Sequence, residues 1–271
     1  MDYLVYEPPP NLQSFVKCFW TLEDEAHTEI APQRVVPDGC MEMIIHYGDL
    51  YKQFLEDGAT IIQPRSFIFG QITNYIEIAP TGKSGVVAAR FLPEGLAPLL
   101  DVPVASLENK AVELTILFGK KAGALEQQVI MAKNNSERIH FIEEFLLSHL
   151  GEQRQIENIT KSCVDAIVRS QGQLGMTALA VKVNTHRRQI ERRFSEAVGM
   201  SPKQLSRVVR LQATLKMMEQ KKFDTLTSLA LENGYYDQAH FIKDFREFTG
   251  MSPKSFFAGN LQFAALFASA E

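Results

Sequence analysis

The hydrophobic positions follow two different periods along the chain. Over residues 1–92 they alternate in short runs, as in 41–47, which lies between the turn sequences Pro37-Asp38-Gly39 and Gly48-Asp49. Alternation of this kind predicts strands with one buried face. Further runs that we expect to form strands are 59–62, 66–72, 75–78 and 85–91. Short strands at this spacing predict a barrel or a sandwich.

From about Pro93 the apolar spacing becomes helical, and it continues in this way to Leu150. The polar stretch 151–156 is the best candidate for a linker. We therefore expect an N-terminal domain over residues 1–150, β-rich over 1–92 and helical over 93–150. A second domain over 155–258 and a tail over 259–271 would follow it.

One sequence pattern occurs twice in the second half of the chain. The first copy runs from Leu179-Ala180 through Phe194 to the block Gly-Met-Ser-Pro-Lys at 199–203. The second runs from Leu229-Ala230 through Phe245 to the same block at 250–254, 51 positions later. Self-similarity of this kind indicates one supersecondary unit used twice.

Each copy predicts a short helix, a turn and a longer helix. The turn residues are Asn184 and Gly234, which both tolerate the left-handed conformation of a tight turn. One apolar stripe follows each turn at helical spacing and predicts the buried face of the longer helix. The stripes are Ile190, Phe194 and Val198 in the first copy, and Phe241, Phe245 and Phe248 in the second.

The ends of the longer helices are also marked in the sequence. Gly199 and Gly250 are suited to close them, because glycine adopts the left-handed C-terminal conformation without strain. Asp237 is a good N-cap for the second, and we expect Thr185 to cap the first in place of His186. A helix, a tight turn and a second helix form a helix-turn-helix motif, whose second helix enters the DNA major groove.

Residues 155–258 resemble the DNA-binding domain of the AraC/XylS family of transcription regulators. The residues that carry the resemblance are Leu179-Ala180, Arg192-Arg193-Phe194, Gly199-Met200-Ser201-Pro202, Arg210-Leu211, Leu229-Ala230, Gly234-Tyr235, Asp237-Gln238-Ala239-His240-Phe241, Phe245 and Gly250-Met251-Ser252-Pro253. The chain departs from the family at Asn184, where Gly is usual, at His186, where a capping Ser is common, and at Tyr235, which replaces Phe.

The resemblance implies an all-α domain in which one long helix, over 206–218, joins two helix-turn-helix motifs. The strands of residues 1–92 more weakly resemble the cupin-like sensor domains attached to many such regulators. The predicted fold class is therefore α+β, with a β-barrel or cupin-like domain and flanking helices before an all-α domain. The two motifs would enter successive major grooves, about 34 Å apart along the duplex.

The resemblance also places the residues that contact DNA. The base-reading positions fall on Arg188, Glu191 and Arg192 in the first motif, and on Gln238, Ala239 and Lys243 in the second. Arginine can bond both major-groove acceptors of guanine, and glutamine can pair with adenine. Glu191 would accept from cytosine, or would only orient Arg188 or Arg192.

Further basic residues are assigned to other roles. Arg187, Lys203 and Lys254 are expected to contact phosphates, which position the protein without reading bases. Arg210 is expected to make a structural ion pair, and His240 to pack at the start of its helix. The alternative for any Arg-rich helix face is a solvated surface, which the two matched copies make less favourable.

The charge is divided unequally between the two halves. Residues 151–271 hold 17 Lys and Arg against 12 Asp and Glu, a net charge of +5, and the remaining residues hold 11 against 20, a net charge of −9. The positive half is suited to approach phosphates. The three widely spaced cysteines indicate reduced thiols, and neither a secretory signal nor a membrane span is seen, so we expect a cytoplasmic protein.

Three local patterns suggest chemistry that the surrounding residues do not support. Gly82-Lys83-Ser84 lacks the glycine that a phosphate loop needs five positions earlier, where Glu77 stands, and it leads into a strand. His46 stands alone, whereas a metal site needs several ligands. Cys40 fits a buried thiol better than a nucleophile. We expect no metal, no cofactor and no catalysis.

Three classes of function remain. The first is a transcription regulator, activator or repressor, that binds double-stranded DNA and a small-molecule effector, with RNA polymerase and a second copy of the chain as further partners. Arg34, Glu42, Glu77 and Arg90 lie in or beside strands and either line its effector pocket or lie outside it. In the second class the acidic half binds another protein and no small molecule. The third, a repair enzyme of the Ada type, needs a four-cysteine zinc site, and the chain has three cysteines.

Overall fold

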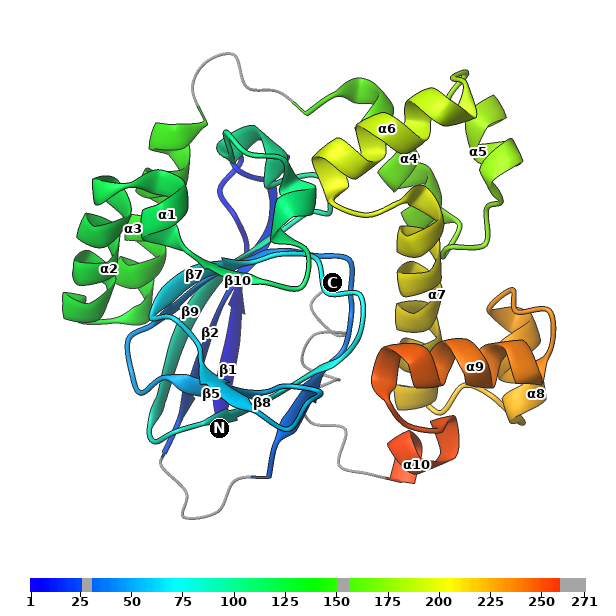
Figure 1. Cartoon of the computed structure of the whole chain (residues 1–271), viewed down its shortest axis with the longest axis horizontal. Helices are drawn as coiled ribbons and strands as arrows, with labels where there is room; N and C mark the ends of the chain where they lie inside the picture. Colours follow the sequence, from blue (N-terminus) through cyan, green and yellow to red (C-terminus); the bar gives the residue numbers. More distant parts are fainter. Residues whose placement is uncertain (26–30, 151–155, 259–271) are drawn as a thin grey trace.

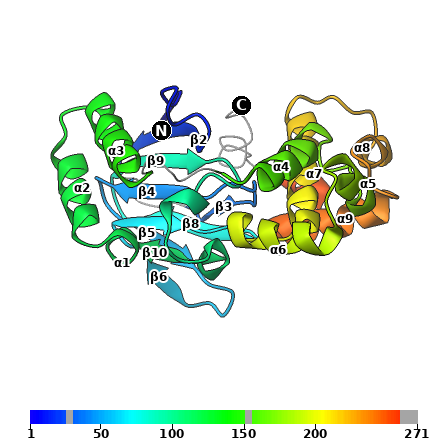
Figure 2. The ribbon, with the colours of Figure 1, turned by 90° about the horizontal axis from the view of Figure 1, so that it is seen from above.

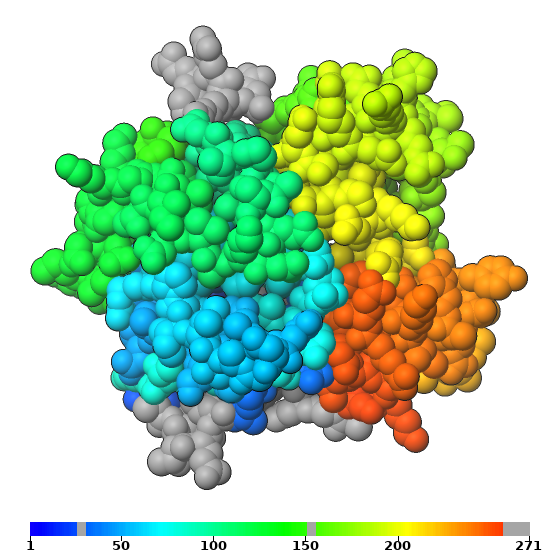
Figure 3. Space-filling model, viewed as in Figure 1, coloured from blue at the N-terminus to red at the C-terminus, as the bar shows by residue number. Residues whose placement is uncertain are grey.

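The computed structural model describes residues 1–25, 31–150 and 156–258. A sheet-rich N-terminal part and an all-helical C-terminal part lie side by side (Figures 1 and 2). Figure 3 shows that the two parts are in contact along one flank of each. This is the mixed α+β fold that the sequence predicts. No helix among the described residues is long and apolar enough to cross a membrane.

The strands of the N-terminal part form two antiparallel sheets. The larger has the order β1 (Asp2–Tyr6), β2 (Val16–Asp24), β9 (Ser84–Phe91), β4 (Glu42–His46), β7 (Ser66–Phe69) and β10 (Ala111–Glu113). The smaller has the order β3 (Gln33–Val35), β8 (Ile76–Pro80), β5 (Tyr51–Phe54) and β6 (Thr60–Ile62). Among the described strands each sheet has two free edges, so the expected closed barrel is wrong and the two sheets form a sandwich.

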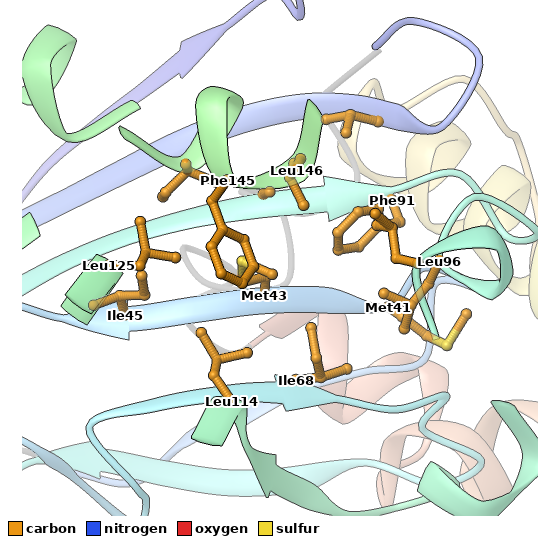
Figure 4. Packing of buried hydrophobic residues seen from close by; sticks show 14 of the residues in the cluster. Met41, Met43, Ile45, Ile68, Phe91, Leu96, Leu114, Leu125, Phe145 and Leu146 are labelled. Carbon is orange, nitrogen blue, oxygen red and sulfur yellow. The ribbon is translucent and has the colours of Figure 1, made fainter. Parts of the chain in front are cut away.

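Helices cover the outer face of the larger sheet. They are α1 (Leu114–Phe118), α2 (Lys120–Met131) and α3 (Asn135–His149), and two 3₁₀ turns, η1 (Ala97–Leu99) and η2 (Val104–Leu107), precede them. In Figure 4, Met43 and Ile45 of β4 point toward Leu125 and Phe145 of these helices. Because side chains alternate along a strand, the other residues of β4 face the smaller sheet.

The C-terminal part consists of helices among its described residues. They are α4 (Asn158–Arg169), α5 (Met176–Lys182), α6 (Arg187–Val198), α7 (Pro202–Glu219), α8 (Leu226–Glu232), α9 (Gln238–Thr249) and α10 (Pro253–Ala258). The pairs α5–α6 and α8–α9 are the two predicted motifs, and α7 is the predicted joining helix. The expected linker lies almost entirely, and the tail wholly, outside the described residues.

The turn and end residues of both motifs behave as the sequence predicts. Asn184 and Gly234 have φ values of +48° and +73°. Gly199 and Gly250 adopt the left-handed conformation at the ends of α6 and α9. The carboxylate of Asp237 accepts the backbone N–H of His240 and caps α9.

The expected cap of the first long helix is wrong. α6 follows His186, and no side chain caps its first turn. The left-handed turn brings the backbone N–H of Thr185 onto the carbonyl of Ala180, at 3.1 Å. The hydroxyl of Thr185 then points backwards and donates to the carbonyl of Val183 at 3.0 Å.

Candidate nucleic-acid interface

Helix α7 holds the second motif through a partly buried charge cluster. The guanidinium of Arg207 donates to both carboxylate oxygens of Asp244, at 2.9 and 3.2 Å, and to both of Glu247, at 2.7 and 3.0 Å. Asp244 is buried in α9, and fork-shaped pairing of this kind fixes orientation as well as distance. Arg207 therefore sets the rotation of α9 about its own axis.

A second arginine of α7 joins the two motifs to each other. Arg210 donates to the carbonyl of Gly172, ahead of α5, at 2.9 Å and to that of Gly234, in the turn before α9, at 3.4 Å. Its guanidinium lies 5.1 Å from the ring centroid of Tyr235. The predicted structural role is thus confirmed, but its partners are carbonyl groups and an aromatic ring, and the expected ion pair with a carboxylate is wrong.

The two longer helices run in the same general direction. The C-terminal end of α6 lies against η2, and Gly199 approaches Val104. The C-terminal end of α9 also lies against the N-terminal part, since Arg34 donates to the carbonyl of Thr249 at 3.0 Å. The N-terminal ends of both helices therefore point away from the sheets (Figures 1 and 2).

A groove of about 830 Å³ lies between the two motifs, with α7 as its floor. Arg187 and Glu191 line it from α6, and His240 and Lys243 line it from α9. Lys203, an expected phosphate contact, lines it at the start of α7. The structure thus brings four basic residues into one groove from elements far apart in sequence. They are Arg187, Lys203, His240 and Lys243.

The remaining candidate residues lie outside this groove. Arg188, Arg192 and Ala239 are exposed, Gln238 is half-buried, and Lys254 is exposed on α10. The repeat explains the division. A shift of 51 residues places Arg188 on Ala239 and Arg192 on Lys243. Two parallel helices face each other with opposite sides, so of the equivalent pair Arg192 and Lys243 only Lys243 lines the groove.

The equivalent positions of the two helices are accessible. Arg188, Arg192, Ala239 and Lys243 are all exposed, and none is covered by the N-terminal part. Arg192 and Lys243 therefore hold equivalent, solvated positions on two helices that run in the same direction.

Two candidate residues have partners that the sequence did not indicate. Glu191 accepts from Arg187 at 2.9 Å, whereas Arg188 or Arg192 was expected. Arg187 lies one turn, i to i+4, before Glu191 on the same helix face, so the two side chains meet; whether Glu191 accepts from cytosine stays a prediction. The amide oxygen of Gln238 accepts from the hydroxyl of Thr227 at 2.8 Å, which joins α9 to α8.

The N-terminal part contains a cavity of about 80 Å³ between its two sheets. Glu42 and Arg90, two of the four polar residues left open by the sequence, line it. Arg90 Nη2 lies 2.6 Å from a carboxylate oxygen of Asp38, and its Nε lies 3.0 Å from Glu42 Oε1. Desolvation raises the pKa of Glu42, which Arg90 opposes.

The other two open residues lie outside this cavity. Arg34 pairs with Glu77 at 2.8 Å across β3 and β8, beside the C-terminal part. Sequence reasoning missed Asp38, Trp20 and Gln63 as cavity residues. Asp38 was treated only as part of a turn, and the alternation of β4, which turns Glu42 toward the cavity, was the available signal.

The three patterns set aside in the sequence can also be placed. Burial raises the pKa of the Cys40 thiol to about 12, so it is a poor nucleophile. Gly82-Lys83-Ser84 leads from a turn into β9, as predicted. Within the described ranges, no three His, Cys, Asp or Glu side chains are grouped as metal ligands.

Comparison with protein families identifies the second half of the chain. Residues 179–259, which contain both motifs and α7, match the family described as "Helix-turn-helix domain". These residues form a helix-turn-helix domain of the AraC type. Residues 4–113 match a domain family of unknown function, DUF6597. The cupin-like resemblance of the N-terminal part stays a prediction.

One curated relative carries the same kind of domain. The chain is 27% identical over 163 residues to an uncharacterized HTH-type transcriptional regulator of Haemophilus influenzae. The match covers 58% of this chain and 53% of the relative, so the chain spans about half the length of the curated relative it matches.

Solved structures of ToxT from Vibrio cholerae are similar to this chain at low sequence identity. One has a TM-score of 0.46 at 12% identity and covers 89% of this chain and 98% of ToxT. Another, with unsaturated fatty acid bound to ToxT, has a TM-score of 0.43 at 12% identity and covers 94% of each chain.

Proposed function

We propose that this protein is a transcription regulator whose two helix-turn-helix motifs read a DNA duplex in successive major grooves. The observation that carries the proposal is that Arg192 and Lys243 are exposed at equivalent positions of two matched helices. Arg188 accompanies Arg192 in the first motif, and Ala239 accompanies Lys243 in the second. Arg187 and Lys203 would contact phosphates from the groove between the motifs.

The connection between the two motifs supports simultaneous reading of two major grooves. α7 and Arg210 join the motifs within one rigid unit, so neither helix can turn without the other. One copy of the chain would therefore bind an asymmetric site of about two helical turns. Such a protein would act in the cytoplasm, with RNA polymerase and a second copy of the chain as further partners.

We further propose that the N-terminal part binds a small-molecule effector in the cavity between its sheets. The segment 36–40 supports a connection to the DNA-binding half, because it contacts both. Asp38 reaches Arg90 in the cavity, whereas Val36 packs in the core of the second motif. The carbonyl of Pro37 accepts from Gln212 of α7 at 2.6 Å. A ligand that moves Asp38 would thus move α7 relative to the sheets.

Selection of bound duplexes from a random library tests the reading of DNA. The expected result is one asymmetric consensus with two conserved blocks about one helical turn apart, about 34 Å. Hydroxyl-radical and methylation footprinting should protect the major groove in both blocks on one face of the duplex. Recovery of no consensus, or of one short block, would count against reading by two motifs.

A further inference from the structure

His46 is buried without a hydrogen-bond partner in the wall of the cavity. Its side chain is 3% exposed, and neither ring nitrogen has a partner among the described residues. Tyr51 stacks on the imidazole with ring centroids 5.3 Å apart. The amide of the neighbouring Gln63 donates to Gln53, at 3.4 Å, and Gln63 also lies close enough to the imidazole to oppose the fall in the pKa of His46. Buried polar groups are nearly always satisfied, so an orphaned imidazole needs an explanation.

The imidazole of His46 is uncharged at neutral pH. Burial, assisted by the charge of Arg65, lowers the pKa of His46 to about 4. A neutral imidazole has one N–H donor and one acceptor nitrogen. It can therefore pair with a hydroxyl or a carbonyl group, and it offers no positive charge to an anion.

The charged groups at the opposite end of the cavity are already paired with one another. One guanidinium, that of Arg90, lies between the two carboxylates of Asp38 and Glu42. The indole N–H of Trp20 also donates to Glu42, at 3.0 Å. A ligand carboxylate placed there would be repelled by the two acids, and a ligand ammonium would be repelled by the guanidinium between them.

Between these two ends the lining is apolar. It consists of Leu22, Ile44, Phe69, Ile76, Ile78 and Val86. An ion that leaves water for such surroundings loses its hydration without gaining a partner, which is costly. A hydrocarbon group has no such hydration to lose, and the burial of its apolar surface is favourable.

We infer that this cavity takes an uncharged, mainly apolar small molecule with one hydroxyl or carbonyl group, which hydrogen-bonds His46. The inference rests on the proposed function only for the role of that molecule as an effector. The cavity volume of about 80 Å³ is roughly half that of a cavity that admits benzene, about 150 Å³. The part of the ligand that enters it is therefore small.

A matched series of four-carbon probes tests this chemistry in the full chain. The probes are 1-butanol, butyrate and butylammonium, which differ in charge but little in size. Trp20 is the only tryptophan of the chain and lines the cavity, so its intrinsic fluorescence reports occupancy without a label. Thermal unfolding gives a second measurement, because a ligand of the folded state raises Tm.

We expect 1-butanol to change the Trp20 emission and raise Tm, and both ions to bind at least tenfold more weakly. His46→Phe keeps an aromatic ring but removes the hydrogen bond, and it should weaken 1-butanol by about fivefold, the value of a net bond near 1 kcal/mol. Binding of either ion as tightly as the alcohol overturns the inference, and so does unchanged alcohol binding by His46→Phe. If that variant fails to fold, the comparison of the three probes on the natural chain decides alone.

The two proposals fail separately in these experiments. If the chain selects a duplex site but binds no alcohol, the inference about the cavity is refuted and the proposed reading of DNA stands. If the chain binds the alcohol but selects no duplex, the proposed function is refuted and the inference about the cavity stands.

Discussion

Replacement of Arg192 and Lys243 by alanine, singly and together, tests whether two helices read one duplex. Both side chains are exposed, and no ion pair within the described residues holds either of them. Their loss should leave the free energy of unfolding within about 0.5 kcal/mol of the natural value. Any change in DNA affinity then reports a lost contact with DNA rather than a damaged fold.

The expected magnitude follows from the type of contact. A side chain that reads a base edge contributes about 1–3 kcal/mol to discrimination, which is roughly 5- to 150-fold in affinity. The two residues lie on different helices with no shared partner, so their effects should add. The double variant should therefore lose about 2–6 kcal/mol on the selected duplex.

Fluorescence anisotropy with the selected duplex and with a scrambled duplex of equal length measures both quantities. Lys120→Ala is the matched control, because it removes the same charge from an exposed position on α2, at the far end of the molecule (Figure 1). Equal losses on the two duplexes would mean that Arg192 and Lys243 contact phosphates only. A double variant no weaker than one of the single variants would mean that only one motif reads bases.

Three further outcomes are expected. Arg207→Ala leaves the carboxylate of Asp244 buried without its partner and should lower the free energy of unfolding in urea by about 2–3 kcal/mol, whereas a destabilisation below about 0.5 kcal/mol would contradict the clamp. Burial raises the pKa of Glu94 to about 7, so ionisation of this carboxyl lowers the free energy of unfolding as pH rises from about 4.5 to 7. Glu94→Gln should therefore be more stable than the natural chain in alkaline buffer and should lose that advantage in acid. Chemical denaturation at several pH values measures this difference. All three cysteines are buried, so Ellman's reagent should react with none of them in the native chain at mildly alkaline pH and with three in urea; rapid reaction of Cys40 in the native state would show that its thiol is accessible.

The sequence predicts the helical half more fully than the sheets. The repeat, the left-handed turns and the glycine ends depend on local backbone chemistry, which one sequence displays. Strand β2 is buried on both faces along most of its length, so it shows no alternation and is not among the strands that the sequence predicts. Strand β10 has three residues and lies within a helical stretch. The edges of the two sheets depend on pairings far apart in the chain, which no local pattern shows.

The site residues divide in the same way. Their positions on α6 and α9 follow from the repeat and the family resemblance, and their contacts with DNA stay a prediction. The pairing of Arg207 with Asp244 joins residues 37 positions apart, and that of Arg90 with Asp38 joins residues 52 positions apart. Such pairs depend on how elements pack, so the sequence indicated the residues without their partners.

The joining helix α7 fixes the distance between the two motifs. Each added or removed residue within α7 would turn one motif by about 100° and displace it by about 1.5 Å relative to the other. It would also pull Arg210 away from one of the two carbonyl groups that it bridges. The distance between the two motifs is thereby fixed by one uninterrupted α-helix, and relatives with differently spaced motifs would need a break in it.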